Sequence, residues 1–316
     1  MRHLPAAVAV LLFAVPTLVW TESARAESGN VELKKQDNAV EVKIDGKEFT
    51  SLRVDKSQPK PYFYPVRAAD GAIVCRQLEN PVDHPHHKGI WCSIDEVNGI
   101  KFWAEKGKIE NHSVELVAAS GNPAKIKLVN HWLGDDGKPV VVETVALSIF
   151  ANRLIAYDAR FTAGEKPVAF HDTKEGMFGI RMANSIREKQ PTDQPGGHIV
   201  NAEGLKSDKE CWGKESKWVD YYGPVDGKTY GVTIMDNPKN FRRSRYHVRA
   251  YGLFTISPFG QKAYTDKSEK ELPADPFVLE PGKSARLRYG LAVHEGDTQQ
   301  GKVTELYDFY LKHSGE

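Results

Sequence analysis

Three histidines lie within four residues in the segment Asp83–Trp91, which reads DHPHHKGIW. The unperturbed pKa of an imidazole is close to neutral pH, so His84, His86 or His87 can donate or accept a proton during a reaction. Pro85 denies this stretch a regular ladder of backbone hydrogen bonds. We therefore expect a loop that is held in one shape and that presents imidazoles to a ligand.

The same histidines allow two other interpretations. In an extended chain, His84 and His86 point to one side and His87 to the other. A His-x-His pair on one face can chelate a metal ion if another histidine or an acid completes the site. The imidazoles can also simply bond backbone groups of a structural loop. We favour acid–base chemistry by His86 or His87 and assign no metal or other cofactor.

A second polar cluster is the segment His171–Gly176, which reads HDTKEG and is followed by Arg181. His171 and Glu175 can supply a base and an acid, and Arg181 can hold an anionic or hydroxyl group of a substrate. The alternative is an ordinary charged turn before a buried strand.

The third candidate region is residues 237–260, which contain a predicted strand at Tyr246–Ile256. Its polar residues are Asn240, Arg242, Arg243, Arg245, His247 and Arg249. The alternation of the strand places His247, Arg249 and Tyr251 on one face. Burying such groups without partners is costly, so this face is either solvated or forms the floor of a polar pocket. We favour the pocket, with His247 as a catalytic candidate and Arg249 as a substrate-binding candidate.

Aromatic residues complete the set of candidates. Tryptophan rings can stack on the C–H faces of sugars, although they more often pack in a core. Trp91 belongs to the histidine segment, and Trp218, Asp220 and Tyr222 alternate along one short run. We predict that this trio forms one wall of the site, with Asp220 as a second candidate carboxylate.

The elements that must position these residues are mostly strands. Apolar residues alternate with polar ones in many runs separated by short turns, as in the run 31–50 around Asp45-Gly46. Another turn is predicted at Ala151-Asn152-Arg153. The one helix predicted is C-terminal, where Val303, Leu306, Tyr307, Tyr310 and Leu311 recur at helical spacing after a cap at Asp297 or Thr298. The other predicted strands are 113–117, 125–129, 143–150, 155–161, 229–235 and 284–293.

This pattern predicts an all-β fold, an antiparallel β-sandwich with one C-terminal helix, formed as a single domain by residues 27–316. Residues 1–26 resemble a signal peptide, with a basic start, an apolar run and the cleavage site Ala24-Arg25-Ala26. We therefore expect a secreted or periplasmic protein, cleaved after Ala26, with no membrane span in the mature chain.

The overall composition limits the partners. The chain has 43 basic and 42 acidic residues, so it lacks the basic excess of a nucleic-acid-binding protein. Its three cysteines allow at most one disulfide. There is no G-x-S-x-G motif, P-loop, dinucleotide fingerprint or H-E-x-x-H motif. A small molecule or a glycan is the expected ligand.

The run PVDHPHHKGIWCSIDEVNGIKFW resembles the signature of a family of secreted bacterial proteins known as PmoA-like, or "methane oxygenase PmoA". The resemblance continues through EGMFGIRMAN, CWGKESKWVDYYG and YHVRAYGLFTISPFG. It implies a β-supersandwich fold and a link to sugar processing, but it assigns no catalytic residues. The positions that match its most distinctive motifs are His84, His86, His87, His171, Glu175, Arg181, Asp220, His247 and Arg249.

Three functions remain open from the sequence. The leading hypothesis is a carbohydrate-active enzyme (an epimerase, lyase or hydrolase) with a histidine as general acid and Glu175 or Asp220 as general base. Arg181 and Arg249 would hold the substrate. The alternatives are a non-catalytic glycan-binding or envelope protein, and a metal-dependent hydrolase or oxygenase that uses His84 and His86.

Overall fold

The computed structural model describes residues 28–81, 83–192, 196–266, 268 and 270–315. The predicted signal peptide lies outside these residues, so it stays a prediction. No helix in the described ranges is both long and apolar enough to cross a membrane.

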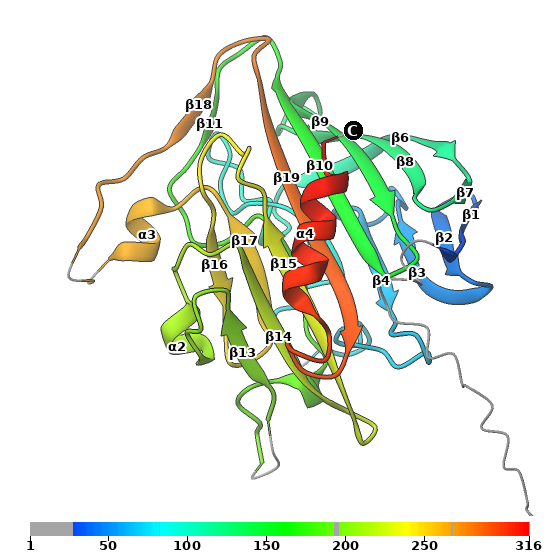
Figure 1. Cartoon of the computed structure of the whole chain (residues 1–316). Coiled ribbons are helices and arrows are strands. Elements are labelled where there is room, and N and C mark those ends of the chain that lie inside the picture. The colour runs from blue at the N-terminus through cyan, green and yellow to red at the C-terminus, as the bar shows by residue number, and fades with distance from the viewer. Residues whose placement is uncertain (1–27, 82, 193–195, 267, 269, 316) are drawn as a thin grey trace, which may run out of the picture.

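Two large antiparallel sheets form most of the molecule (Figure 1). The first has nine strands in the order β16-β17-β12-β5-β4-β3-β2-β1-β7. In that order they are Arg245–Val248, Leu253–Ser257, Phe178–Arg181, Ile90–Cys92, Tyr62–Val66, Lys47–Arg53, Ala39–Ile44, Val31–Lys35 and Ser120–Gly121.

The second sheet has eight strands in the order β13-β14-β15-β19-β10-β9-β8-β6. In that order they are His198–Asn201, Trp218–Val225, Lys228–Asp236, Ser284–Glu295, Leu154–Ala163, Pro139–Ile149, Ala124–Leu133 and Lys108–Ala118. A small separate sheet pairs β11 with β18. The remaining elements are β11 (Val168–Phe170), β18 (Phe277–Leu279), α2 (Ser207–Cys211), η1 (Asn184–Ile186), α3 (Gln261–Thr265) and α4 (Val303–His313).

The main hydrophobic core lies between the two large sheets. Every second residue of the strands enters it, for example Phe63, Ile90, Phe178 and Tyr246, while the neighbouring residues face outward. The prediction of an all-β antiparallel sandwich with a C-terminal helix is thereby confirmed. The thiols of the three cysteines are buried and free.

The predicted turns occur where Asp45-Gly46 joins β2 to β3 and where residues 151–153 join β9 to β10. Asp45, Gly46 and Arg153 have left-handed φ values of 50°, 76° and 61°. The predicted strand Tyr246–Ile256 is wrong, because it is a hairpin of β16 and β17. Gly252, with φ of 92°, turns the chain there, and Leu253 accepts a hydrogen bond from the Arg249 amide.

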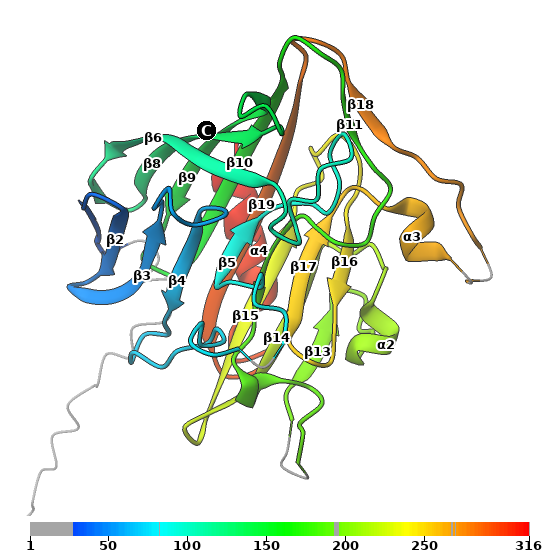
Figure 2. The ribbon, with the colours of Figure 1, turned by 180° about the vertical axis from the view of Figure 1, so that it is seen from behind.

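Helix α4 covers the outer face of the eight-stranded sheet (Figure 1). Val303, Leu306, Tyr307 and Tyr310 are buried there, as their spacing predicts. The predicted cap is wrong: Asp297 instead accepts backbone hydrogen bonds from Gln299 and Gln300 in a turn that precedes the helix. On the outer face of the nine-stranded sheet, Tyr264 of α3 and Trp212, which follows α2, pack against His247 of β16. Figure 2 shows this sheet in front with α4 behind.

Candidate functional site

One row of side chains crosses the outer face of the nine-stranded sheet. Directly paired residues of adjacent antiparallel strands lie on the same face. Following the pairings from β3 to β16 therefore gives a continuous line, whose members are Arg53, Tyr62, Trp91, Gly179, Thr255 and His247. Gly179 sits in the middle, where a Cβ atom would come within 2.3 Å of the Phe254 carbonyl oxygen.

Aromatic residues gather above this row in a cluster separate from the main core. Trp91, Trp103 and Leu253 are buried together, and Tyr62 and Tyr251 pack against them half-buried. The loop 83–88 lies over this cluster, so the histidine segment and β17 meet although they are far apart in the sequence.

Two buried arginines hold this loop in place. Arg76 donates to the carbonyl oxygens of Asp83, His84 and His87 at 2.9, 2.9 and 3.1 Å. Arg181 donates through Nη2 to both carboxylate oxygens of Asp83 at 2.9 and 3.0 Å. The Arg181 side chain is fully buried. Arg181, predicted to bind substrate, therefore lies where it positions the loop instead.

Four aromatic rings stack in parallel within the cluster, in the order Tyr251, His84, His87 and Trp91. Successive ring centroids are 5.4, 4.7 and 5.6 Å apart, with interplanar angles of 4°, 7° and 17°. His84 has a left-handed φ of 40°, which is uncommon for residues other than glycine. The stack and the bond from Arg76 offset the cost of that backbone conformation.

The buried histidines of the loop are neutral. The Arg181 Nη1 atom lies 3.0 Å from His87 Nδ1. A guanidinium only donates hydrogen bonds, so His87 Nδ1 is the acceptor and its proton sits on Nε2. Burial lowers the pKa of His87 far below its usual value, with a further contribution from the charges around it. Burial, with the charge of Lys60, lowers the pKa of His86 to about 4.

The buried side chain of Lys60 contacts the loop 83–88 and Trp91. Lys60 Nζ donates to the His86 carbonyl oxygen at 2.9 Å and to Glu105 Oε1 at 2.7 Å. Its ammonium lies 5.8 Å from the centroid of the Trp91 ring. Burial lowers the pKa of Lys60 to about 8, although Glu105 acts in the opposite direction.

Glu175 is the carboxylic acid of this site. It precedes β12, its side chain is 30% exposed, and its Oε2 lies 3.7 Å from Nδ1 of the buried His247. Among the described residues, none donates a hydrogen bond to the Glu175 carboxyl group. Burial raises the pKa of Glu175, although the charges of Lys174 and Arg249 oppose the shift.

His247 is held in one tautomer. The carbonyl oxygen of Lys174 lies 2.9 Å from its Nδ1, so that nitrogen carries the proton and Nε2 is bare. Burial lowers the pKa of His247 to about 3, and Arg249 adds to the shift. The Arg249 guanidinium lies 5.9 Å and the Arg181 guanidinium 4.7 Å from the centroid of the Tyr251 ring.

The arrangement combines four chemical groups on one partly open surface. Glu175 offers a carboxyl group with a raised pKa, and His84, whose side chain is 43% exposed, offers an imidazole. Arg249 offers a cation that donates hydrogen bonds, and Tyr251 offers a hydroxyl group. Such a set can transfer a proton to and from a bound polar ligand.

The geometry gives no support for a metal site. His84 and His86 lie close, with ring centroids 5.7 Å apart and planes at 74°. Within the part of the chain that the structure covers, no three His, Cys, Asp or Glu side chains are placed to hold a metal ion.

Four predicted residues lie away from this cluster. His171 is exposed, and its nearest carboxylate is Glu96, at 3.7 Å. The predicted wall of Trp218, Asp220 and Tyr222 belongs to β14 of the other sheet. Trp218 packs in the cluster under α4, and Tyr222 stands against His198 with centroids 5.2 Å apart.

Asp220 is fully enclosed by protein partners. Its Oδ1 accepts from Thr233 at 2.9 Å and lies 2.9 Å from His294 Nε2, and its Oδ2 accepts from Thr298 at 2.7 Å. This network joins β14, β15, β19 and the connection to α4.

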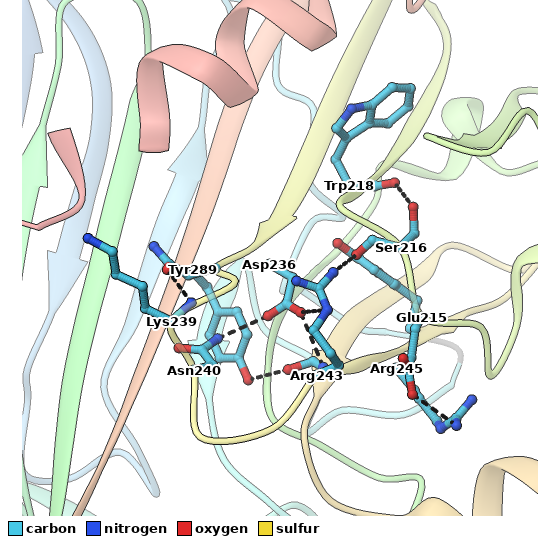
Figure 3. Close-up of polar contacts among 12 residues, drawn as sticks. Glu215, Ser216, Trp218, Asp236, Lys239, Asn240, Arg243, Arg245 and Tyr289 are labelled. Atoms are coloured by element: carbon cyan, nitrogen blue, oxygen red, sulfur yellow. Dashed lines mark hydrogen bonds and ion pairs between the residues drawn. The ribbon is translucent and has the colours of Figure 1, made fainter. Parts of the chain in front are cut away.

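Arg243, one of the arginines that precede His247, belongs to a separate network around Asp236 (Figure 3). Asp236 Oδ1 accepts from Asn240 at 2.9 Å, and its Oδ2 lies 3.4 Å from Arg243 Nε. Burial raises the pKa of Asp236 to about 6. Arg245 pairs with Glu215 at 3.0 Å. The predicted third region is thus divided, and only its second half, from His247 on, faces the cluster.

Sequence reasoning missed Lys60, Tyr62, Trp103 and Glu105. The alternation of Tyr62 and Tyr64 with apolar neighbours was an available sign of a strand, β4. Nothing near Lys60 in the sequence indicates burial, because its partners lie 26 and 45 residues away.

Several solved structures resemble the chain at low identity. A galactose 1-epimerase from Lactobacillus acidophilus has 8% identity and a TM-score of 0.42, with 86% of this chain and 100% of that chain covered. A putative aldose 1-epimerase from Klebsiella pneumoniae has 12% identity and a TM-score of 0.38, with 90% and 86% covered. A polysaccharide lyase has 12% identity and a TM-score of 0.34, with 86% and 34% covered.

With TM-scores below 0.5, these similarities carry no inference about what this chain binds. No curated protein matches it in sequence. One family model does match, over residues 39–308, which include the whole histidine cluster, and the chain therefore belongs to DUF6807, a family of unknown function.

Proposed function

We propose that this protein is an exported, carbohydrate-active enzyme that transfers protons on a sugar bound to the outer face of the nine-stranded sheet. Glu175 is the group that accepts and returns the proton. Arg249 and Tyr251 hold the ligand beside it, and the loop 83–88 forms the opposite wall.

The observation that carries this proposal is the state of the Glu175 carboxyl group. It is partly buried, its pKa is raised, and no described residue donates a hydrogen bond to it. A carboxylate held only for structure normally has its acceptors satisfied by donors. A raised pKa also brings a carboxyl group nearer to neutral pH, where general acid–base catalysis is most efficient.

A sugar fits the surroundings of Glu175. The ring faces of His84 and Tyr251 are covered by each other, by His87 and by the Arg181 guanidinium, so these two residues meet a ligand with ring edges and with the Tyr251 hydroxyl group. Arg249 can donate to the hydroxyl groups of a sugar. The buried imidazole of His247 has its bare Nε2 as an acceptor. Its neutrality at working pH keeps positive charge low next to Glu175.

The test is a search for proton transfer with the full mature chain. Neutral aldoses, uronic acids and linear oligosaccharides would be followed by NMR for anomeric exchange and for deuterium uptake at carbon. Ultraviolet absorbance would report elimination, and reducing ends would report hydrolysis. We expect one of these reactions in the wild-type protein, and a loss of roughly a hundredfold or more in kcat for Glu175→Gln.

The matched control is Glu96→Gln. The Glu96 side chain is also 30% exposed, but it pairs with His171 and Lys101 on the neighbouring loop. It should retain wild-type kcat. Equal turnover by the wild type and Glu175→Gln would refute the proposed role of Glu175.

A second candidate is glycan binding without catalysis. It is favoured by the burial of His87, Arg181 and His247, which leaves few reactive groups at the surface. Saturable binding of a sugar without turnover of any compound in the panel, weakened in a Tyr251→Ala variant, would establish it in place of the enzyme.

A further inference from the structure

The outer face of the nine-stranded sheet carries a second feature, a groove over β2, β3 and β4. Its volume is about 800 Å³. Side chains from the three strands form its floor, among them Glu41, Arg53 and Tyr64, and Glu79 closes one side. The proposed catalytic cluster lies over β5, β12, β17 and β16 of the same face, and Figure 2 shows the strands in sequence across it.

Tyr62 connects the groove with the catalytic cluster. It lines the groove, and it also packs against the aromatic cluster around Trp91. In the row across the sheet it stands between Arg53 and Trp91. The Lys88 ammonium lies 5.9 Å from the centroid of its ring. Tyr62 and His247 are four strand steps apart in this row, which is ~19 Å at the usual strand spacing. Trp91 between them is buried beneath the loop 83–88, so a ligand that reaches both Glu175 and the groove passes over this loop.

The chemistry of the groove favours an uncharged, hydroxyl-rich ligand. Acidic and basic side chains alternate across its floor, with Lys43 paired to Glu48 in the strand register and Arg67 3.6 Å from Glu48. A polyanion would meet Glu41 and Glu79, and a polycation would meet Arg53. Hydroxyl groups both donate and accept, so they suit a surface of mixed sign. Tyr62 and Tyr64, two residues apart on one strand face, offer rings for stacking.

The shape of the groove excludes the commonest mode of peptide binding. An extended peptide usually adds a strand to an open sheet edge through backbone hydrogen bonds. The floor of this groove is a sheet face made of side chains, and β2, β3 and β4 each have strands on both sides. Sites for drug-sized ligands occupy ~300–1,000 Å³. At about 800 Å³, the groove has room for several sugar rings rather than one.

We propose that the groove over β2–β4 binds further units of the same ligand, so that the substrate is a neutral oligosaccharide or polysaccharide chain. One end of that chain occupies the site at Glu175, several further units cross the loop 83–88, and later units lie on Tyr62, Tyr64 and Arg53. This inference rests on the proposed function only in assuming that the cluster binds a sugar.

The test is the dependence of affinity on chain length. Isothermal titration calorimetry would compare xylo-, cello-, manno- and malto-oligosaccharides of increasing length with the corresponding monosaccharides. We expect the affinity for at least one series to rise tenfold or more with length in the wild-type protein. Tyr64→Ala should lose most of that gain and keep the affinity for the monosaccharide.

The matched control is Tyr222→Ala, which truncates a half-buried tyrosine on the other sheet and should keep the full gain. Arg53→Ala removes an exposed side chain from the groove, so it provides a second test if Tyr64→Ala fails to fold. Affinities that do not change with length would overturn the proposal. So would an undiminished gain in folded Tyr64→Ala or Arg53→Ala, or no binding of any series.

The two proposals fail in different ways. If no reaction is found but affinity rises with length and depends on Tyr64, the catalytic role of Glu175 fails and the groove stands. If sugars are converted by a Glu175-dependent reaction but length has no effect, the groove proposal fails alone.

Discussion

Two histidine–carboxylate pairs lie on the two large sheets of this protein. In the first, His247 Nδ1 is 3.7 Å from Glu175, and the carboxylate side chain is 30% exposed. In the second, His294 Nε2 is 2.9 Å from Asp220, and both side chains are buried. The same residue types thus occur once at an accessible surface and once in an enclosed network.

The surroundings of the carboxylates explain the difference. Asp220 accepts hydrogen bonds from Thr233 and Thr298 as well as contacting His294, so its oxygens are occupied and it joins strands to the connection before α4. Glu175 precedes β12, beside Tyr264 of α3, its side chain is 30% exposed, and no described residue donates a hydrogen bond to its oxygens. A histidine next to a carboxylate therefore indicates chemistry only where the carboxylate keeps free acceptors that solvent can reach.

The largest expected effect on activity or stability comes from replacing each of the two carboxylates, one at a time, by its amide. Glu175→Gln should lose roughly a hundredfold or more in kcat while its unfolding midpoint stays the same. Asp220→Asn should lower the free energy of unfolding by about 3 kcal/mol, because it breaks the buried pair with His294. The folded variant should keep its kcat. Urea denaturation and steady-state kinetics on both variants check the contrast. The comparison breaks if Asp220→Asn loses activity without losing stability.

The next effect concerns the loop 83–88. Arg181→Met removes the charge and the hydrogen bonds that hold Asp83 and His87, and it should reduce the free energy of unfolding by about 3 kcal/mol. Hydrogen exchange of the loop amides should speed up more than exchange in α4. Arg286→Met is the control, because Arg286 pairs with Asp158 at the surface of the other sheet. Unchanged exchange in the loop would contradict the positioning role of Arg181.

The next prediction concerns His247 and how the free energy of unfolding depends on pH. The folded-state pKa of His247 is about 3, below its unfolded value near 6.5, so the unfolded chain binds the extra proton between these values. Stability from this group is therefore present above pH 6.5 and is lost as the pH falls towards 3. Lowering the pH from 6.5 to 4.5 should cost the wild type about 2 kcal/mol more than a His247→Gln variant.

Urea denaturation at both pH values measures this difference. Equal losses in the wild type and His247→Gln would show that the imidazole is not held neutral by burial. Glu175 acts with the opposite sign, because its raised pKa makes the folded state hold its proton more tightly as the pH falls.

The smallest expected effect is at His171. Its side chain is 46% exposed, and it lies beside Glu96. His171→Ala should change kcat less than twofold and stability by less than about 0.5 kcal/mol, as is usual for exposed positions. A large loss of activity would extend the catalytic site from Lys174, whose carbonyl oxygen bonds His247, to the start of the 171–174 loop.

The local features of this protein follow from residues that are close together in the sequence. Alternating apolar residues predicted strands, Asp45-Gly46 and residues 151–153 predicted turns, and helical spacing after Val303 predicted α4. Proline in the histidine segment predicted a loop. These features depend on neighbours within a few positions, which is the range over which backbone propensity and periodicity act. Membership of the PmoA-like family and export stay predictions.

Which of the candidate residues lie together at the site depends on long-range contacts in the folded chain. The period of a strand defines two faces, but it does not say which face meets the other sheet. Arg181 is buried because Asp83, 98 residues away, folds over it, and Asp220 is enclosed because His294 arrives from β19. Glu175 lies beside Tyr264, about 90 residues later in the chain, and its side chain stays 30% exposed. The partners of a polar side chain fix its role, and here those partners are distant in the sequence.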